Sequence, residues 1–505
     1  MTTRYMRTMR IKHGISILLI VVLLIVSWYQ ILRQSLIGGD GGFQYFIHPF
    51  FTGDGGLPLV LFRPDAGARL LYELVVRIFG DNIVPFQYIA LIGLIVVCIS
   101  FYFLVYQLTS NKPIALLSTI LFGVNFTTTF EMVAIGSFAF FAQRMIQLVP
   151  QFISLVCFDR SVRGKNRFLA FFSILFFILA FLLAQYSMLF VPFFFLYLFS
   201  LLIAKKHPVS APIGFSLLFV FAVVSYVLLF WLAKMTPEPP YSGSVNLALF
   251  WTHYGVTIPS QLLRQLTILT IPDSIIRYGT SLLQRSYNDG IVYLYLPVLG
   301  LYAVIGAYLY RKETSLRSVM LSCLLYFPVI FFLNLFIRGD EVTKIYTSSR
   351  YLHLASISFS IFWGIFLFVL VKSSFAGKIL GTVIILLWII YNTVAIRAEI
   401  QKEFYQHIAV KKSLEFVKSL APYYQTDSIV IVPSPLSYYG SYFAQMFYGK
   451  DKTVFAPYFS DWANTLPRPF DPNRDFIFDY DSNKSTVTDR TNEYKSIIAE
   501  RTTRP

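Results

Sequence analysis

Eleven apolar runs decide what this chain can fold into, because each is long enough to cross a bilayer, which takes roughly 17 to 25 residues. They fall at 14–32, 85–107, 114–130, 138–158, 168–184, 186–204, 211–233, 291–310, 316–337, 352–371 and 379–396. With 56% hydrophobic and 13% charged residues, the chain carries too much apolar surface for a soluble fold. The sequence predicts an all-α polytopic membrane protein with about 11 transmembrane helices.

Three places in this pattern need interpretation. The continuous run 168–204 is divided at Gln185-Tyr186-Ser187, because one helix of that length would exceed the bilayer. The first run follows a basic segment, but it is too long for a signal peptide and has no small-residue cleavage site, so we interpret it as a retained helix. The stretch 247–271 is interrupted by polar residues and proline, which is typical of an interfacial or re-entrant helix.

Basic residues in the short loops predict the orientation, since such residues gather on the cytoplasmic side. With the N-terminus inside, the inner loops carry Lys112, Arg160, Arg163, Lys165, Arg167, Lys205, Lys206, Arg311, Lys312, Arg317, Lys372 and Lys378. The odd number of spans places the C-terminus outside. The net charge of +16 is thereby explained by topology signals and does not indicate a nucleic-acid partner.

The C-terminal part has a different composition. Residues 1–396 form the predicted transmembrane domain, and 397–466 a small extracytoplasmic α/β cap. Its predicted elements are a helix over 396–421, strands over 428–432 and 453–458, and a helix over 438–447. The polar tail, 467–505, is expected to be poorly ordered.

The cysteines indicate neither a disulfide framework nor a metal site. Cys98, Cys157 and Cys323 all lie within apolar runs, where cysteine is a small core residue. No group of histidine and acidic residues has the spacing of a metal site.

The outer loops hold the unusual polar residues. Asp40 stands between glycines in the first external loop, 33–84, where backbone without Cβ atoms permits close approach to a ligand; a flexible turn is the alternative. Asp54 has similar surroundings. Within the fourth run lies Arg144, with Gln143 and Gln147 beside it; charge inside a membrane indicates function unless the side chain reaches the interface.

Three motifs in order resemble a known family. They are Phe62-Arg63-Pro64 with Phe79-Gly80-Asp81-Asn82 and Phe86-Gln87-Tyr88, then Leu121-Phe122 through Glu131, then Ser349-Arg350-Tyr351-Leu352-His353-Leu354. Together these resemble the GT-C glycosyltransferases, in particular the membrane-embedded O-mannosyltransferases that carry tetratricopeptide repeats, although no such repeats follow here. The resemblance covers roughly 38–400 and implies a GT-C-like fold.

The resemblance also implies an activity: transfer of a sugar from a polyprenyl- or dolichyl-phosphate carrier. Asp40 matches the family's catalytic base, which takes a proton from the acceptor hydroxyl with inversion at the anomeric carbon. Arg350 matches the arginine that binds the donor phosphate, a role suited to a permanently charged guanidinium. The alternative for Arg350 is contact with lipid headgroups.

Other residues are secondary candidates. Arg63 and Arg264 are further candidates for the donor phosphate, and Arg63 alternatively pairs with Asp65. Asp54, Glu131 and His353 are candidates for acceptor binding or support, with a turn residue and a solvated loop acid as the alternatives for the first two. No resident cofactor is indicated, and a divalent metal held jointly with the donor phosphate stays open.

Three functional interpretations compete. The first is an integral membrane glycosyltransferase that uses a lipid-linked sugar donor and a glycan, lipid or protein acceptor outside the cytoplasm. The second is a transporter or flippase of lipid-linked sugars, for which internal repeats would be typical. The third is a catalytically silent relative of GT-C enzymes.

Overall fold

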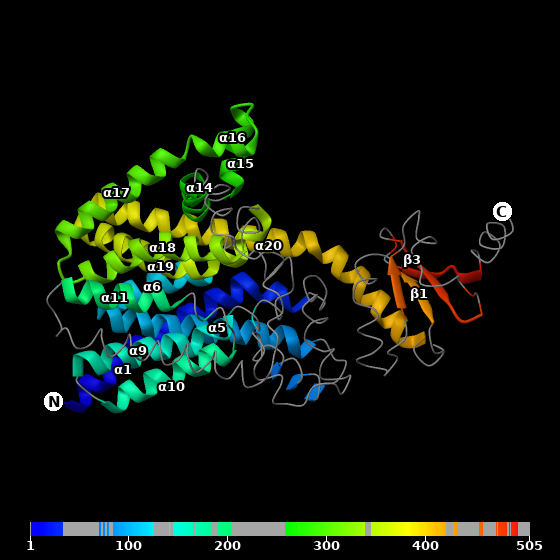
Figure 1. The fold of residues 1–505 in the computed structure, drawn as a ribbon, viewed down its shortest axis with the longest axis horizontal. Coiled ribbons are helices and arrows are strands. Elements are labelled where there is room, and N and C mark those ends of the chain that lie inside the picture. Colours follow the sequence, from blue (N-terminus) through cyan, green and yellow to red (C-terminus); the bar gives the residue numbers. More distant parts are fainter. Residues whose placement is uncertain are drawn as a thin grey trace. The chain divides into compact units, whose positions relative to one another are not determined.

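The computed structural model of the chain describes most of its helices and one small sheet. The described residues are 2–33, 70–71, 74–75, 78–79, 84–125, 141, 145–164, 167–183, 187, 190–203, 258–271, 273–338, 345–420, 428–432, 454–457, 471, 473–481, 484 and 486–492. The helices (Figure 1) are α1 (Thr2–Trp28), η1 (Tyr29–Arg33), α5 (Val84–Thr109), α6 (Lys112–Gly123), α9 (Leu148–Gly164), α10 (Arg167–Leu183), α11 (Val191–Ile203), α14 (Ile258–Thr270), α15 (Asp273–Leu282), α16 (Tyr287–Val292), α17 (Tyr295–Lys312), α18 (Arg317–Arg338), α19 (Ile345–Ser373) and α20 (Phe375–Leu420).

Helices long and apolar enough to cross a membrane identify a membrane protein. Within the described part of the chain there are five such segments, at His13–Arg33, Val84–Thr109, Gly290–Lys312, Leu352–Ser373 and Phe375–Gln401. Shorter apolar helices occupy Lys112–Gly123, Phe168–Leu183, Val191–Leu201 and Arg317–Phe332. The predicted class, a mostly helical membrane protein with a small sheet, is confirmed. These helices do not establish the predicted number of about 11 spans. The predicted span at 211–233 lies outside the described residues.

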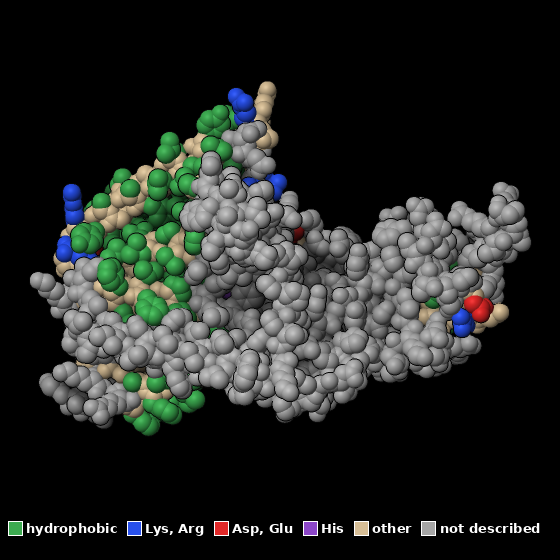
Figure 2. All heavy atoms as spheres, viewed as in Figure 1, with side chains coloured by type: hydrophobic (Ala, Val, Ile, Leu, Met, Phe, Trp, Pro, Cys, Tyr) green, Lys and Arg blue, Asp and Glu red, His purple; other side chains and the backbone are tan. Residues whose placement is uncertain are grey.

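The apolar helices differ in how far they are buried. In α19, 72% of the most apolar window is buried inside the protein, whereas in α20 the share is 17%. Figure 2 shows hydrophobic side chains spread over the exposed surface of this helical region, and Leu296 and Val304 of α17 are among the most exposed. A water-soluble protein rarely exposes so much apolar surface, so these faces fit contact with lipid.

Small residues allow a close helix crossing. Gly364 of α19 packs against Ser118 of α6, and a Cβ atom added at Gly364 would lie 2.9 Å from the Ser118 backbone nitrogen. Close approach of backbones at small residues is a common way for helices to associate in membranes. α6 and α19 therefore pack through backbone contact.

Serine pairs join other helices. Ser154 of α9 donates to the carbonyl of Ser173 in α10 at 2.7 Å, and Ser173 donates back to the Ser154 carbonyl at 2.9 Å. Ser322 of α18 donates to Ser200 of α11 at 3.0 Å. Such bonds satisfy hydroxyls that would otherwise be costly in hydrocarbon.

Gly364→Ala is expected to destabilise the protein. The added methyl group would force α6 and α19 apart, and overpacking typically costs about 1–3 kcal/mol, so the midpoint of thermal unfolding should fall by several degrees. Gly300→Ala on α17 is the matched control, because nothing lies within 4 Å of a Cβ atom at that position. An equal midpoint for Gly364→Ala and wild type would contradict the close crossing.

The helix α20 differs from its prediction. The sequence predicts a span at 379–396 and a separate amphipathic helix at 396–421, but the structure has one continuous helix, Phe375–Leu420. No glycine or proline interrupts 382–420, so nothing in the backbone ends the helix where the side chains turn polar. At that point the side chains change from apolar to amphipathic, while the backbone stays helical.

The sheet lies in the C-terminal part. Its strands β1 (Ile429–Val432), β2 (Val454–Pro457), β3 (Phe476–Asp481) and β4 (Thr486–Asp489) are arranged in the order β2-β1-β3-β4. β1 is parallel to both β2 and β3, while β3 and β4 are antiparallel. The first two strands were predicted, and the helix predicted at 438–447 lies outside the described residues.

β3 and β4 correct the expectation of poor order after 467. Val430, Ile431 and Ile477 are fully buried in the sheet. The buried carboxylate of Asp475 accepts hydrogen bonds from the backbone nitrogens of Ile429, at 2.8 Å, and Asp471, at 2.6 Å. This part of the tail is ordered because β3 pairs with β1 and buries Ile477 in the sheet.

The chain divides into two compact units. The first contains Met1–Trp28, Gly93–Glu131 and Arg144–Ile396, and the second contains Tyr29–Ile92, Met132–Gln143 and Arg397–Pro505. The sheet belongs to the second unit, and the serine pairs and the α6–α19 crossing belong to the first.

Candidate functional site

Several predicted site residues have no described placement. Asp40, Asp54, Arg63 and Glu131 all lie outside the described residues, as does Arg144. The roles predicted for them therefore stay predictions.

Arg350 and His353 lie near the beginning of α19. Arg350 is in its first two turns, and the imidazole of His353, one turn further on, belongs to a residue only 3% exposed. Ser358, further along the same helix, is about 12 Å from Arg350 along the axis at 1.5 Å per residue. α19 thus contains both of these predicted site residues, and of the two the structure describes the burial of His353.

Arg264 lies on α14, which packs against α17 and α19. The predicted interfacial or re-entrant segment at 247–271 contains this helix, Ile258–Thr270. The arginine is half-buried, and its Nε atom is fully covered.

An apolar cavity lies beside α14. Its volume is about 210 Å³. The lining residues come from α14, α17, α18 and α19 (Figure 1) and are Leu262, Leu263, Leu266, Leu299, Tyr302, Cys323, Leu324, Phe327, Pro328, Ser358, Phe359 and Phe362. Arg264 immediately follows two of these leucines along α14. Arg264 is not itself a lining residue, and the lining suits an apolar ligand.

Tyr302 fixes one wall of the cavity. Its hydroxyl accepts a hydrogen bond from Trp363 Nε1 at 2.9 Å and lies 3.2 Å from the Thr270 hydroxyl. Its ring stacks on Phe362, with the centroids 5.4 Å apart. These contacts join α14, α17 and α19 and use the phenol's polar end, so the cavity keeps an apolar lining.

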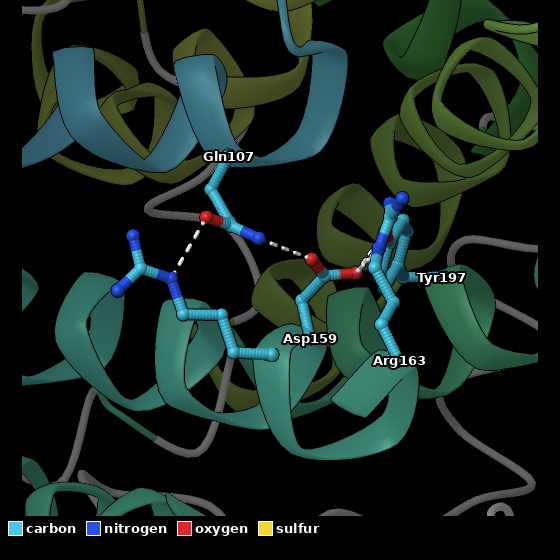
Figure 3. Close-up of polar contacts among 5 residues, drawn as sticks. Gln107, Asp159, Arg163 and Tyr197 are labelled. Atoms are coloured by element: carbon cyan, nitrogen blue, oxygen red, sulfur yellow. Dashed lines mark hydrogen bonds and ion pairs between the residues drawn. The ribbon is translucent and has the colours of Figure 1, made fainter. Parts of the chain in front are cut away.

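A polar cluster joins three other helices (Figure 3). The carboxylate of Asp159 in α9 accepts hydrogen bonds from Gln107 Nε2 of α5 at 2.8 Å, from Arg163 Nε at 2.8 Å and from the Tyr197 hydroxyl of α11 at 2.7 Å. Arg160 Nε donates to Gln107 Oε1 at 3.0 Å. We call these five residues the Asp159 cluster.

The Asp159 cluster holds a buried charge. Asp159 has no exposed surface, whereas the Arg163 side chain is 43% exposed. Burial lowers the pKa of the Arg163 guanidinium, but hydrogen bonding and charge from Asp159 and Tyr197 outweigh burial and hold that pKa above its ordinary value. Arg163 therefore stays charged, and the cluster acts as a polar tie between α5, α9 and α11.

Sequence reasoning missed this cluster. Arg160 and Arg163 were interpreted as orientation signals, and Asp159 was not singled out. The available signal is that Asp159 and Arg163 are four residues apart, which places them on one face of a helix. Gln107 and Tyr197 carry no such signal, because each lies on another helix.

The cysteines and the possible metal ligands are the remaining candidate site residues. Cys98 and Cys323 are buried, Cys157 is half-buried, and all three are free thiols. In the parts of the chain that the structure describes, no group of three histidine, cysteine or acidic residues is arranged to hold a metal ion.

Comparison with known proteins adds no family. No protein-family model matches the chain, and a search of curated proteins finds no match. The fold and the described residues define a helical membrane protein with an apolar cavity lined by α14, α17, α18 and α19, and with a half-buried arginine on α14.

Proposed function

We propose that this protein is an inverting glycosyltransferase that moves a sugar from a polyprenyl-phosphate carrier to a glycan, lipid or protein outside the cytoplasm. Asp40 is the general base that deprotonates the acceptor hydroxyl, and Arg350 binds the donor phosphate. Arg63 and Arg264 are further phosphate ligands, and Asp54, Glu131 and His353 support the acceptor. The N-terminus is cytoplasmic and the C-terminus extracytoplasmic.

The apolar cavity that α14 helps to line carries the proposal. A polyprenyl phosphate combines a long hydrocarbon chain with a charged head. The cavity offers an apolar environment for the chain, and Arg264 lies on α14, which supplies part of that lining, although it is not itself a lining residue. Burying each methylene group of such a chain is worth about 0.8 kcal/mol. Its 210 Å³ fits a short stretch of carbon chain, so the remainder of the carrier would lie in lipid.

Charge supports the same ligand. Arg264 lies on the helix that supplies Leu262, Leu263 and Leu266 to the cavity. Guanidinium groups bind phosphate oxygens in a bidentate manner and remain charged in apolar surroundings.

Arg264→Gln is expected to weaken carrier binding about tenfold to a hundredfold. Hydrogen bonds to charged groups contribute about 1.5–3 kcal/mol, and 1.4 kcal/mol is a factor of ten in affinity. The measurement is equilibrium binding of labelled polyprenyl phosphate to the full chain in nanodiscs. Arg285→Gln is the control, because Arg285 is exposed after α15.

The outcomes of that measurement separate the possibilities. Equal affinity for Arg264→Gln and wild type would assign the phosphate to Arg350 or Arg63 instead. Absence of carrier binding in the wild-type protein would contradict the proposed function. Carrier binding without sugar transfer would favour a flippase of lipid-linked sugars or a catalytically silent relative.

A further inference from the structure

Two buried glutamines stand at the beginning of α9. Neither Gln147 nor Gln151 has any exposed surface. Among the residues that the structure describes, neither amide oxygen nor amide nitrogen of either side chain has a hydrogen-bond partner. The Gln151 backbone nitrogen donates to the Gln147 carbonyl at 3.2 Å, so the two residues are already one helical turn apart and share a face.

The nearest polar group on that face behaves differently. Ser154, one turn after Gln151, makes its hydrogen bonds with Ser173 of α10. Next to Gln151, the ring of Phe152 lies 5.4 Å from that of Phe101 and 5.9 Å from that of Phe190. Aromatic rings therefore lie next to the helix here. Among the described residues, single unpaired amide atoms also occur, for example at Gln87 and Gln261, but both amide atoms are unpaired only at Gln147 and Gln151.

Leaving such groups unpaired is costly. A buried polar group without a hydrogen bond costs about 1–3 kcal/mol, whereas an apolar side chain of the same shape would be neutral or stabilising. Native proteins pair nearly all buried polar groups, so each exception calls for an explanation. A ligand that supplies the missing bonds explains two glutamines together.

We propose that Gln147 and Gln151 form a binding subsite for a neutral, hydroxyl-bearing ligand, namely the sugar of the lipid-linked donor. A carboxamide offers two donors and one acceptor oxygen, which can satisfy neighbouring hydroxyls in either direction. It carries no charge, so it is poorly suited to the phosphate, for which guanidinium groups are the better ligands. The identity of the ligand as a donor sugar rests on the proposed function.

The proposal is tested with Gln147→Met and Gln151→Met, which keep the side-chain length but remove the amide. Gln401→Met is the matched control, because Gln401 is an exposed glutamine on α20. For each full-length protein in nanodiscs, the midpoint of thermal unfolding is measured without ligand, with polyprenyl phosphate and with a polyprenyl-phosphate hexose. Equilibrium binding of both compounds is measured in parallel.

The expected result has two parts. Without ligand, each variant unfolds at the same temperature as wild type or higher, because an unpaired amide has been removed. The preference of wild type for the hexose-bearing compound over the bare phosphate falls about tenfold in each variant, while affinity for the bare phosphate is unchanged. The control shows neither change.

Three results would overturn the subsite. A lower midpoint without ligand would mean that the amides stabilise the fold. An unchanged hexose preference would mean that they do not contact the sugar, and no hexose preference in wild type would mean that a sugar is not the ligand. Failure of the proposed function has a different signature, since wild type would then bind neither compound.

Discussion

Asp159→Ala is expected to lower the free energy of unfolding by about 3 kcal/mol. Removing one partner of a buried ion pair typically costs about 3–5 kcal/mol. We expect a value at the lower end of this range, because the Arg163 side chain is 43% exposed. Water can therefore replace part of the hydrogen bonding that its guanidinium loses. Tyr197 and Gln107 would also lose the acceptor of their hydrogen bonds. The midpoint of thermal unfolding in nanodiscs measures the effect.

Two variants calibrate that result. Tyr197→Phe removes one donor while the ring stays, so about 1 kcal/mol is expected, the usual net value of a hydrogen bond. Asp479→Ala breaks a pair with Arg490 in which both side chains are about 40% exposed, and less than about 1 kcal/mol is expected. If Asp159→Ala unfolded no earlier than Asp479→Ala, the Asp159 cluster would not tie the helices together.

Asp40→Asn is expected to reduce sugar transfer about 100- to 10,000-fold, the usual contribution of a general base. The amide has nearly the same shape as the carboxylate but cannot take the acceptor's proton. Carrier affinity should stay at the wild-type value, because the phosphate is assigned to arginines. Single-turnover transfer from a labelled donor, at saturating acceptor, measures the chemical step directly.

Asp54→Asn distinguishes the two glycine-flanked acids. If Asp54 is a turn residue, its replacement leaves the transfer rate near the wild-type value. A loss as large as that of Asp40→Asn would assign chemistry to both acids. A wild-type rate in Asp40→Asn together with a loss in Asp54→Asn would move the base to Asp54.

The hydropathy pattern predicted which segments are apolar better than it predicted where each helix ends. The division of 168–204 near Gln185 agrees with α10 ending at Leu183 and α11 beginning at Val191. The continuity of α20 through Arg397 was missed, because a change from apolar to amphipathic side chains marks a change of surroundings and leaves backbone hydrogen bonding intact. In β3 the mixture of Asp479 and Asp481 with aromatic residues was interpreted as a polar tail, although residues of one strand alternate between faces.

For the candidate sites, the sequence predicts contacts within one helix but not contacts between helices. Periodicity places Asp159 with Arg163, and Gln147 with Gln151, because each pair is one turn apart on one helix. It does not bring Gln107 and Tyr197 to Asp159, since contacts between helices depend on packing. The cavity is likewise built from four helices, and of its lining residues only Cys323 was named from the sequence, as a small core residue.

Sugar transfer from a radiolabelled polyprenyl-phosphate hexose tests the central claim most directly. Purified wild-type protein and Asp40→Asn would each be incubated with the donor and a membrane glycan extract as the acceptor source. The account predicts that wild type moves label from the carrier to the extract and that Asp40→Asn does not, although both bind the donor. Donor binding without transfer by the wild-type protein, across several sugars and acceptor extracts, would contradict it.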